Sequence, residues 1–263
     1  MIGLVCITLF AGAALFAPIV APYGPYDGSL AGGLQAPSPV HWMGTDVQGR
    51  DEFSRVLYGA RVSLQVGVTA VTLAVLMGVV VGALAGGAGG RIDAVFMRVT
   101  DIFLAMPGIL LPIGIVSFLG RGLSQLTLAI AVSYAPTFAR LLRGSLLALR
   151  EADFVIAARS IGATGPRLLL RHMLPNALTP LIVQATLVLA TAIIDIAGLG
   201  FLGLGPPDPS TAEWGTMLSD ASARMATAPY LIFFPGAAIV ISVIGFNLLG
   251  DGLREALDPR LRR

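Results

Sequence analysis

Hydrophobic and polar positions follow one another in long blocks along this chain. Six stretches of mostly apolar residues stand apart, at about 2–21, 62–88, 99–120, 122–142, 177–205 and 228–250. An α-helix needs roughly 20 mostly apolar residues to cross about 30 Å of hydrocarbon. None of the stretches has the alternating polarity of a roughly ten-residue β-barrel strand. The pattern therefore predicts an all-α integral membrane protein with six transmembrane helices.

Composition supports this class. Of the 263 residues, 56% are hydrophobic and only 12% are charged, against about 25% charged in an ordinary soluble domain. All 17 basic residues are arginines scattered between apolar runs, whereas a nucleic-acid-binding protein carries a clustered basic face. The single cysteine, Cys6, excludes an internal disulfide and a cysteine-based metal cluster. We therefore expect membrane lipid around the chain and no nucleic acid.

The first apolar stretch has two interpretations. Ala and Pro follow its core, as in a secretory signal peptide, but signal peptides begin with positive charge and have a core of about 7–15 residues. Residues 1–3 carry no charged side chain. We therefore expect a transmembrane helix, and we expect a charged cytosolic leader to precede residue 1 in the complete protein.

The arginines predict the orientation. With a cytoplasmic N-terminus, the inner segments and the C-terminal tail carry twelve arginines and the outer segments carry five, which satisfies the positive-inside rule. Both termini are therefore expected in the cytoplasm. The inner set is Arg91, Arg98, Arg140, Arg143, Arg150, Arg159, Arg167, Arg171, Arg254, Arg260, Arg262 and Arg263, and the outer set is Arg50, Arg55, Arg61, Arg121 and Arg224.

In this topology residues 22–61 lie outside the membrane. The Pro/Gly-rich run 21–25 cannot form a regular helix. Asp51 is a suitable N-cap for a short helix with an apolar face. We expect that helix to lie at the membrane surface and to end where the chain turns inward near Gly59.

The cytoplasmic segment 143–176 predicts a second short helix. Apolar residues recur at helical spacing from Glu151 to Ile161, and acidic residues in the first turn favour the helix dipole. Gly162 stands where a helix takes a left-handed residue at its end, Gly165-Pro166 begins a new helix, and Leu174-Pro175 predicts a kink. Such a small-residue helix suits insertion into a partner's groove. An ordinary interhelical loop with one helical turn has the same pattern.

This segment resembles the EAA loop of ABC importer permeases, the helix that docks on the ATPase subunit. The resemblance rests on Ala157-Ala158-x-x-x-Gly162 followed by Leu174-Pro175, within runs 154–163 and 171–176 that are similar to the dipeptide/oligopeptide/nickel branch. Ile156 replaces the glutamate of the motif, so its acidic contact is not carried over. Two further blocks resemble the C-type subunit of that branch, namely HWMGTD at 41–46 with 49–51 and 54–55, and LGFLGLG at 199–205 with 213–215 and 217–218.

The resemblance implies the ABC importer permease fold, with residues 1–61 as first span plus extracytoplasmic segment. Residues 62–263 would form the permease domain, with a coupling loop at 148–176 between spans four and five. The resemblance also implies that the chain forms half of a translocation path for dipeptides or oligopeptides. This path would work by alternating access in the bacterial plasma (inner) membrane. Relatives that import nickel or haem leave the cargo open. Coupling to the ATPase is expected of Glu151, Phe154, Ala157, Ala158, Arg159, Ile161 and Gly162.

The same resemblance implies four partner subunits: a homologous permease that forms a heterodimer with this chain, two cytosolic ATPases and an extracytoplasmic solute-binding protein. ATP and Mg would bind to the ATPases. A Walker A loop requires a lysine, and this chain has none, so it is not expected to be an enzyme or to hold a cofactor. His41 and His172 fall on opposite sides of the predicted membrane, which excludes a shared metal site.

Asp195 is the only acidic residue deep in a predicted span. Because a charge there is costly and usually faces the bundle interior, Asp195 is expected either to line the translocation path or to make a structural polar contact. The alternative function is a stand-alone ion-coupled secondary transporter, which would carry several such acids or paired broken helices. Gly78, Gly82, Gly86 and Gly90 recur at four-residue spacing and predict a close helix-packing face.

Overall fold

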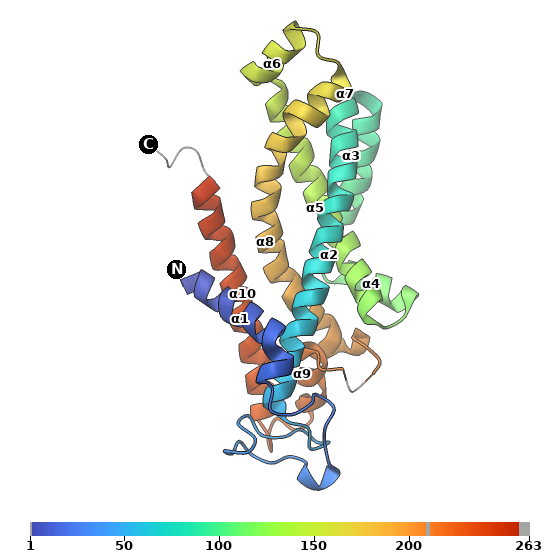
Figure 1. Ribbon diagram of the computed structural model, residues 1–263. Coiled ribbons are helices and arrows are strands. Elements are labelled where there is room, and N and C mark those ends of the chain that lie inside the picture. Colours follow the sequence, from blue (N-terminus) through green and yellow to red (C-terminus); the bar gives the residue numbers. More distant parts are fainter. Residues whose placement is uncertain (1, 209–210, 258–263) are drawn as a thin grey trace.

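The computed structural model describes residues 2–208 and 211–257 and is an elongated helical bundle (Figure 1). Met1, Arg260, Arg262 and Arg263 lie outside the described residues. The α-helices are α1 (Ile2–Val20), α2 (Glu52–Ala88), α3 (Gly90–Ala105), α4 (Leu110–Leu119), α5 (Leu123–Arg150), α6 (Asp153–Ser160), α7 (Gly165–Arg167), α8 (Leu174–Leu199), α9 (Trp214–Ser222) and α10 (Tyr230–Leu257). A 3₁₀ turn η1 (Leu30–Gly32) and two π-helical segments, η2 (Leu168–Met173) and η3 (Gly200–Leu204), complete the set.

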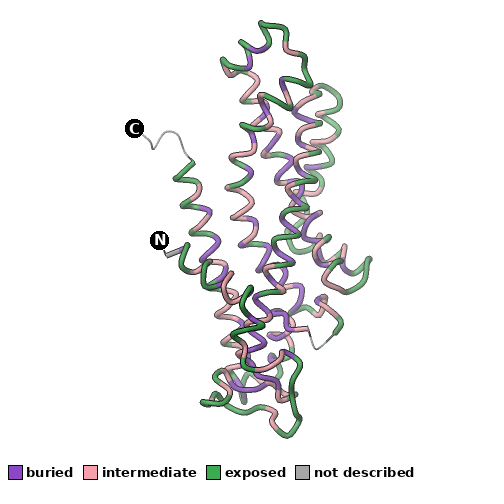
Figure 2. Tube along the Cα trace, viewed as in Figure 1, coloured by how far each residue is buried: buried purple, intermediate pink, exposed green. Residues whose placement is uncertain are grey.

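The bundle has two distinct ends (Figure 1). Residues 21–51 and α9 form one end, here called the loop end, and α6 protrudes at the opposite end, here called the α6 end. Helices α2, α5 and α8 run between the two ends, with α1 and α10 paired beside them near the loop end. Buried residues concentrate where α2, α5 and α8 meet (Figure 2).

Four described helical segments are long and apolar enough to cross a membrane: Gly3–Val20, Glu52–Ala88, Gly165–Leu204 and Tyr230–Leu257. A fifth crossing results if α3 and α4 together form one span. The helix α5 has 28 residues, but its second half carries three arginines. The all-α membrane architecture is therefore confirmed, whereas the count of six spans stays a prediction.

The stretch 99–120 is not the single span that its apolar content predicts. It contains the end of α3 and all of α4, and these two helices are bent by 95°. Met106 between them is extended, with φ −75° and ψ 138°. Pro107 follows it, and a residue before proline is disfavoured in the helical region. The break therefore has a local cause that the run of apolar residues conceals.

The expected short helix after Asp51 is instead the start of a 37-residue helix, α2. Its N-cap is confirmed, because the Asp51 side chain accepts a hydrogen bond of 2.8 Å from the backbone N–H of Ser54. The turn expected near Gly59 is wrong. A Cβ at Gly59 would lie 2.5 Å from Cδ1 of Trp214, and the Trp214 Nε1–H donates to the carbonyl of Val56 at 3.0 Å. Gly59 therefore makes room for an indole ring within a continuous helix.

The glycine face of α2 is confirmed at three of its four positions. A Cβ at Gly78, Gly82 or Gly86 would lie 2.4, 2.7 or 3.0 Å from the nearest atom of α5. These glycines let the two helices approach closely, as small residues do between transmembrane helices. Gly90 does not belong to this face, because it has nothing within 4 Å and a φ of +58°. It instead forms the turn between α2 and α3 together with Gly89.

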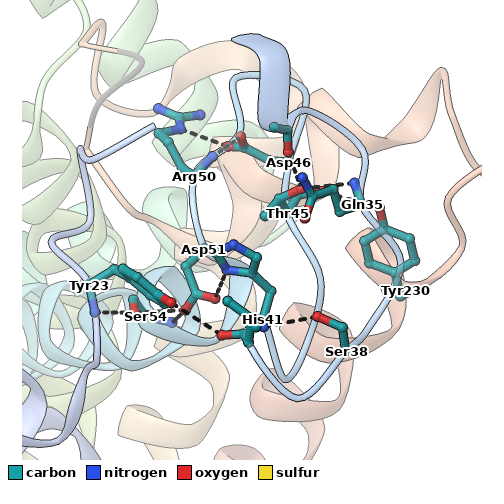
Figure 3. Close-up of polar contacts among 12 residues, drawn as sticks. Tyr23, Gln35, Ser38, His41, Thr45, Asp46, Arg50, Asp51, Ser54 and Tyr230 are labelled. Atoms are coloured by element: carbon teal, nitrogen blue, oxygen red, sulfur yellow. Dashed lines mark hydrogen bonds and ion pairs between the residues drawn. The ribbon is translucent and has the colours of Figure 1, made fainter. Parts of the chain in front are cut away.

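Polar contacts order the loop end (Figure 3). His41 Nδ1 lies 2.9 Å from Asp51 Oδ1, and the Ser54 hydroxyl donates to the second oxygen of that carboxylate at 2.8 Å. Arg50 Nε donates to Asp46 Oδ2 at 2.6 Å. These contacts hold the segment 21–51 against the first turn of α2. His41 thus contacts the side chain that caps α2.

Candidate functional site

The short helix that the sequence predicts in the segment 143–176 is present as α6, which protrudes at the α6 end (Figure 1). The sequence predicts it over 151–161, and the structure shortens it to Asp153–Ser160. Asp153 lies in its first turn, as expected, but Glu151 forms the C-cap of α5. A turn of only two residues therefore joins α6 to a long membrane helix.

The two sides of α6 differ in burial. Val155 and Ala158 are 0% and 7% exposed, and they belong to the main apolar core together with residues of η2. Phe154, Ile156 and Ile161 are 44%, 46% and 88% exposed. Large apolar side chains grouped on one protruding helix mark a surface that contacts another molecule. The free side of α6 therefore has the composition of a docking surface.

The two alanines of the motif, Ala157 and Ala158, lie on different sides of α6. Ala157 and Arg159 are exposed, whereas Ala158 packs against its own chain. The buried side formed by Val155 and Ala158 was not predicted, although their three-residue spacing is the signal of an inward face. Ile156, which replaces the glutamate of the motif, lies on the exposed side.

Gly162 ends α6 in the left-handed conformation that its position predicts, with φ +88°. Its N–H donates to the carbonyl of Arg159 at 3.0 Å, and the N–H of Ala163 donates to the carbonyl of Ala158 at 3.1 Å. These two bonds form a Schellman motif, which satisfies carbonyls at the helix end. A Cβ at Gly162 would meet nothing within 4 Å. The glycine is thus required by backbone conformation and not by space.

The chain returns to the membrane through an almost continuous helix. Pro166 occupies the first turn of α7, as predicted. The kink expected at Leu174-Pro175 takes the form of the π-helical segment η2, where the N–H of Leu174 donates to the carbonyl of Leu169. Pro175 has no N–H to donate to the preceding turn, and its ring clashes with a carbonyl of that turn. The wider π turn accommodates the ring and the missing hydrogen bond.

Asp195 on α8 accepts a hydrogen bond of 2.6 Å from the Tyr134 hydroxyl on α5. Both side chains are partly buried. The structure therefore shows a polar contact between neighbouring helices, which is one of the two roles expected for this acid. Tyr134 was not predicted as its partner.

The block 213–218, which resembles the C-type subunit, holds α9 against the bundle. The Glu213 carboxylate caps α9 by accepting from the backbone N–H groups of Gly215 and Thr216 at 2.8 and 2.9 Å. Glu213 is fully buried, and burial raises its pKa to about 7 although these bonds act in the opposite direction. A side chain at Gly200 would collide with the Glu213 carboxylate.

The raised pKa of Glu213 predicts a pH-dependent stability. The group binds its proton more tightly in the folded chain than in the unfolded chain, whose value is near 4.5. Its stabilising contribution is therefore complete below about pH 4.5 and is lost as the pH rises through about 7. We expect the difference in Tm between the wild-type complex and Glu213→Gln, measured in detergent, to shrink over this interval. A difference that stays constant with pH would contradict the assignment.

Comparison with known families agrees with this geometry. The family model for the binding-protein-dependent transport system inner membrane component matches residues 78–263, which include α6 and α8. The model for the N-terminal TM domain of oligopeptide transport permease C matches residues 1–37. The second match confirms that the first apolar stretch is a transmembrane segment, and it does not favour a signal peptide.

Two relatives align over nearly the whole chain. The dipeptide transport system permease protein DppC of Alkalihalophilus pseudofirmus is 47% identical over 262 residues, covering 100% of this chain and 86% of the relative. The glutathione transport system permease protein GsiD of Escherichia coli is 46% identical over 254 residues, covering 95% and 82%. Matches of this length confirm the resemblance to the C-type branch.

Solved structures share the fold. An inward-facing form of the MetNI methionine ABC transporter has a TM-score of 0.65 at 22% identity and covers 78% of this chain and 96% of its own. An amino acid ABC transporter solved with histidines has a TM-score of 0.60 at 16% identity, covering 77% and 94%. Family model, relatives and fold agree, and none favours a stand-alone secondary transporter. The chain belongs to the permease family of binding-protein-dependent ABC importers, as a C-type subunit.

Proposed function

We propose that this permease forms half of a translocation path for dipeptides or oligopeptides and works by alternating access. The support for the cargo is the alignment with a dipeptide permease over the whole chain, at 47% identity. The glutathione permease, also aligned over most of the chain, is named for a peptide as well. Both names favour peptides over nickel chelates or haem.

The observation that carries the mechanism is the exposed apolar side of α6. Phe154 and Ile161 would dock in a groove of a cytosolic ATPase subunit, because burying them there removes apolar surface from water. Arg159 and Ala157 would lie at the same contact. Closure of two ATP- and Mg-bound ATPases would move α6, and the two-residue turn at Glu151 would pass that motion to α5.

The proposed role implies the remaining partners and the orientation of the chain. The α6 end would face the cytoplasm with both termini, in agreement with the arginine asymmetry, and the loop end would face the solute-binding protein. A homologous permease would supply the other half of the path. ATP hydrolysis would belong entirely to the ATPase subunits, and the chain would reside in the bacterial plasma membrane.

Uptake of a peptide by the assembled complex tests this proposal. We expect proteoliposomes that contain both permeases and both ATPases to take up dialanine only when ATP and the binding protein are present. The affinity-tagged chain should also copurify with its ATPases in detergent. Purification of the chain alone together with uptake driven by an ion gradient would contradict the proposal.

The hydrogen bond at Asp195 leaves the path-lining role as a separate proposal. If Asp195 lines the path, Asp195→Asn changes the transport rate without changing the yield of complex. If the Tyr134 contact is structural, both fall together, and Tyr134→Phe has the same effect. Normal transport with normal yield in Asp195→Asn would remove Asp195 from both roles.

A further inference from the structure

A cavity of about 260 Å³ lies at the loop end, away from α6 and from Asp195. Its walls come from residues 46–50, the first turn of α2, α9 and the start of α10. Two of the sequence blocks that identify the C-type branch, 41–55 and 213–218, meet at this cavity. Its charged lining residues are Asp46, Arg50, Glu52, Arg55, Asp220 and Arg224.

Glu52 is the unusual member of this lining. It is only 2% exposed, and within the described part of the chain its Oε1 atom is buried without a hydrogen-bond partner. An unpaired oxygen in a buried carboxyl group destabilises the folded chain. Native proteins rarely retain a buried polar atom without a hydrogen-bond partner. One usual explanation is that a bound molecule or ion supplies the partner.

The nearest cation does not supply that donor. Arg55 is also 2% exposed, but it points to other acceptors: its Nη1 donates to the carbonyl of Pro25 at 3.2 Å, and its Nε lies 3.6 Å from Asp46 Oδ2. Asp46 is shared with Arg50, whose Nε donates to the same oxygen at 2.6 Å. Within the described part of the chain, Glu52 Oε1 is therefore a buried acceptor without a donor in the wall of this cavity.

The charged residues of the lining indicate which kind of ligand the cavity can bind. Asp46 is already paired with Arg50 and lies 3.6 Å from Arg55, which leaves Glu52, Asp220 and Arg224 as the charged lining residues that can meet a ligand. A ligand with both an ammonium and a carboxylate group meets a partner for each. A volume below the roughly 300 Å³ of drug-sized pockets limits it to a few residues.

We propose that this cavity binds a short zwitterionic peptide, with Glu52 accepting hydrogen bonds from its α-ammonium group and Arg224 pairing with its carboxylate. The proposal rests on peptide import as the function of the complex. It adds a substrate site on the permease itself, at the end of the bundle that would receive cargo from the binding protein. A socket for a lysine of the binding protein fits less well, because three arginines line the same space.

Direct binding to the assembled complex, without its binding protein, tests the site. We expect calorimetry in nanodiscs to detect dialanine and to show at least tenfold weaker binding of N-acetyl-dialanine, which lacks the ammonium group. Glu52→Gln should weaken dialanine binding at least tenfold and leave N-acetyl-dialanine unchanged. The matched control is Asp27→Asn, which removes an exposed acid of the same loop end and should bind dialanine normally. If Glu52→Gln does not assemble, Arg224→Gln, at a partly exposed position, should lower the affinity instead.

Three results would overturn the site. They are equal affinity for the two peptides, unchanged dialanine binding by Glu52→Gln and Arg224→Gln, and a loss of binding-protein affinity in Glu52→Gln with dialanine binding intact. Failure of this site and failure of the proposed function are distinguishable. Normal dialanine uptake without direct binding rejects only the site, whereas direct binding without any peptide uptake rejects only the function.

Discussion

Gly162→Val is expected to abolish substrate-stimulated ATP hydrolysis by the assembled complex, while the chain still inserts in the membrane. Gly162 has φ +88°, a conformation that costs a non-glycine residue about 1–2 kcal/mol, and more for a β-branched one. Nothing lies within 4 Å of a Cβ at this position, so the effect comes from the backbone alone. Loss of the Schellman turn would misplace the free side of α6 relative to the ATPase. ATPase activity with and without loaded binding protein measures the effect.

Gly144→Val is the matched control. Gly144 lies on α5, also has no atom within 4 Å of a Cβ, and has no positive φ. The same substitution there should leave most of the stimulated ATPase activity intact. Equal activities of the two variants would show that the turn at Gly162 does not aim α6.

Gly78→Leu is expected to prevent accumulation of the folded complex, a larger and earlier defect than loss of coupling. A Cβ at this position would lie 2.4 Å from the Cβ of Phe138 and 2.8 Å from the carbonyl oxygen of Ala135. A backbone atom cannot rotate away, so α2 and α5 must separate. Overpacking typically costs about 1–3 kcal/mol, which corresponds to roughly tenfold or more in the folded fraction of a marginal protein. Yield of monodisperse complex after detergent extraction measures it.

The control for this variant lies on the opposing helix. Gly144 of α5 is exposed and has nothing within 4 Å of a Cβ, so Gly144→Leu places the same side chain outside the contact between α2 and α5. Its yield should stay close to that of the wild type. A normal yield of Gly78→Leu would mean that the glycine face of α2 does not set the distance between the helices.

Sequence predicts the features of this chain that have local causes. The turn at Gly162, the N-cap at Asp51 and the helix start at Pro166 each depend on a few neighbouring residues, and the structure has all three. The break after Met106 also has a local cause, because Pro107 follows it. A long run of apolar residues obscures this cause when spans are assigned from hydrophobicity alone.

Features that depend on distant residues were not predictable in the same way. Gly59 suggests a turn until the ring of Trp214 is found against it, 155 positions further along the chain. The partner of Asp195 lies 61 positions away. The burial of Ala158 depends on η2, which follows only after α7. In each case the structural role of the residue depends on a segment that is distant in the sequence and packs beside it.

The uninterrupted length of α2 has a mechanical consequence. At 1.5 Å per residue, its 37 residues extend over about 55 Å, well beyond the roughly 30 Å of hydrocarbon. Near the α6 end, Arg150 donates to the carbonyls of Gly86 and Gly87 at 2.5 and 2.9 Å, while the opposite tip of the helix carries Glu52. A rod of this length behaves as a lever: a tilt of about 5° about one end displaces the other by about 5 Å. A small tilt at the α6 end would thus move the loop-end tip of α2 by several ångströms because the helix moves as one body, with no signal passed from residue to residue.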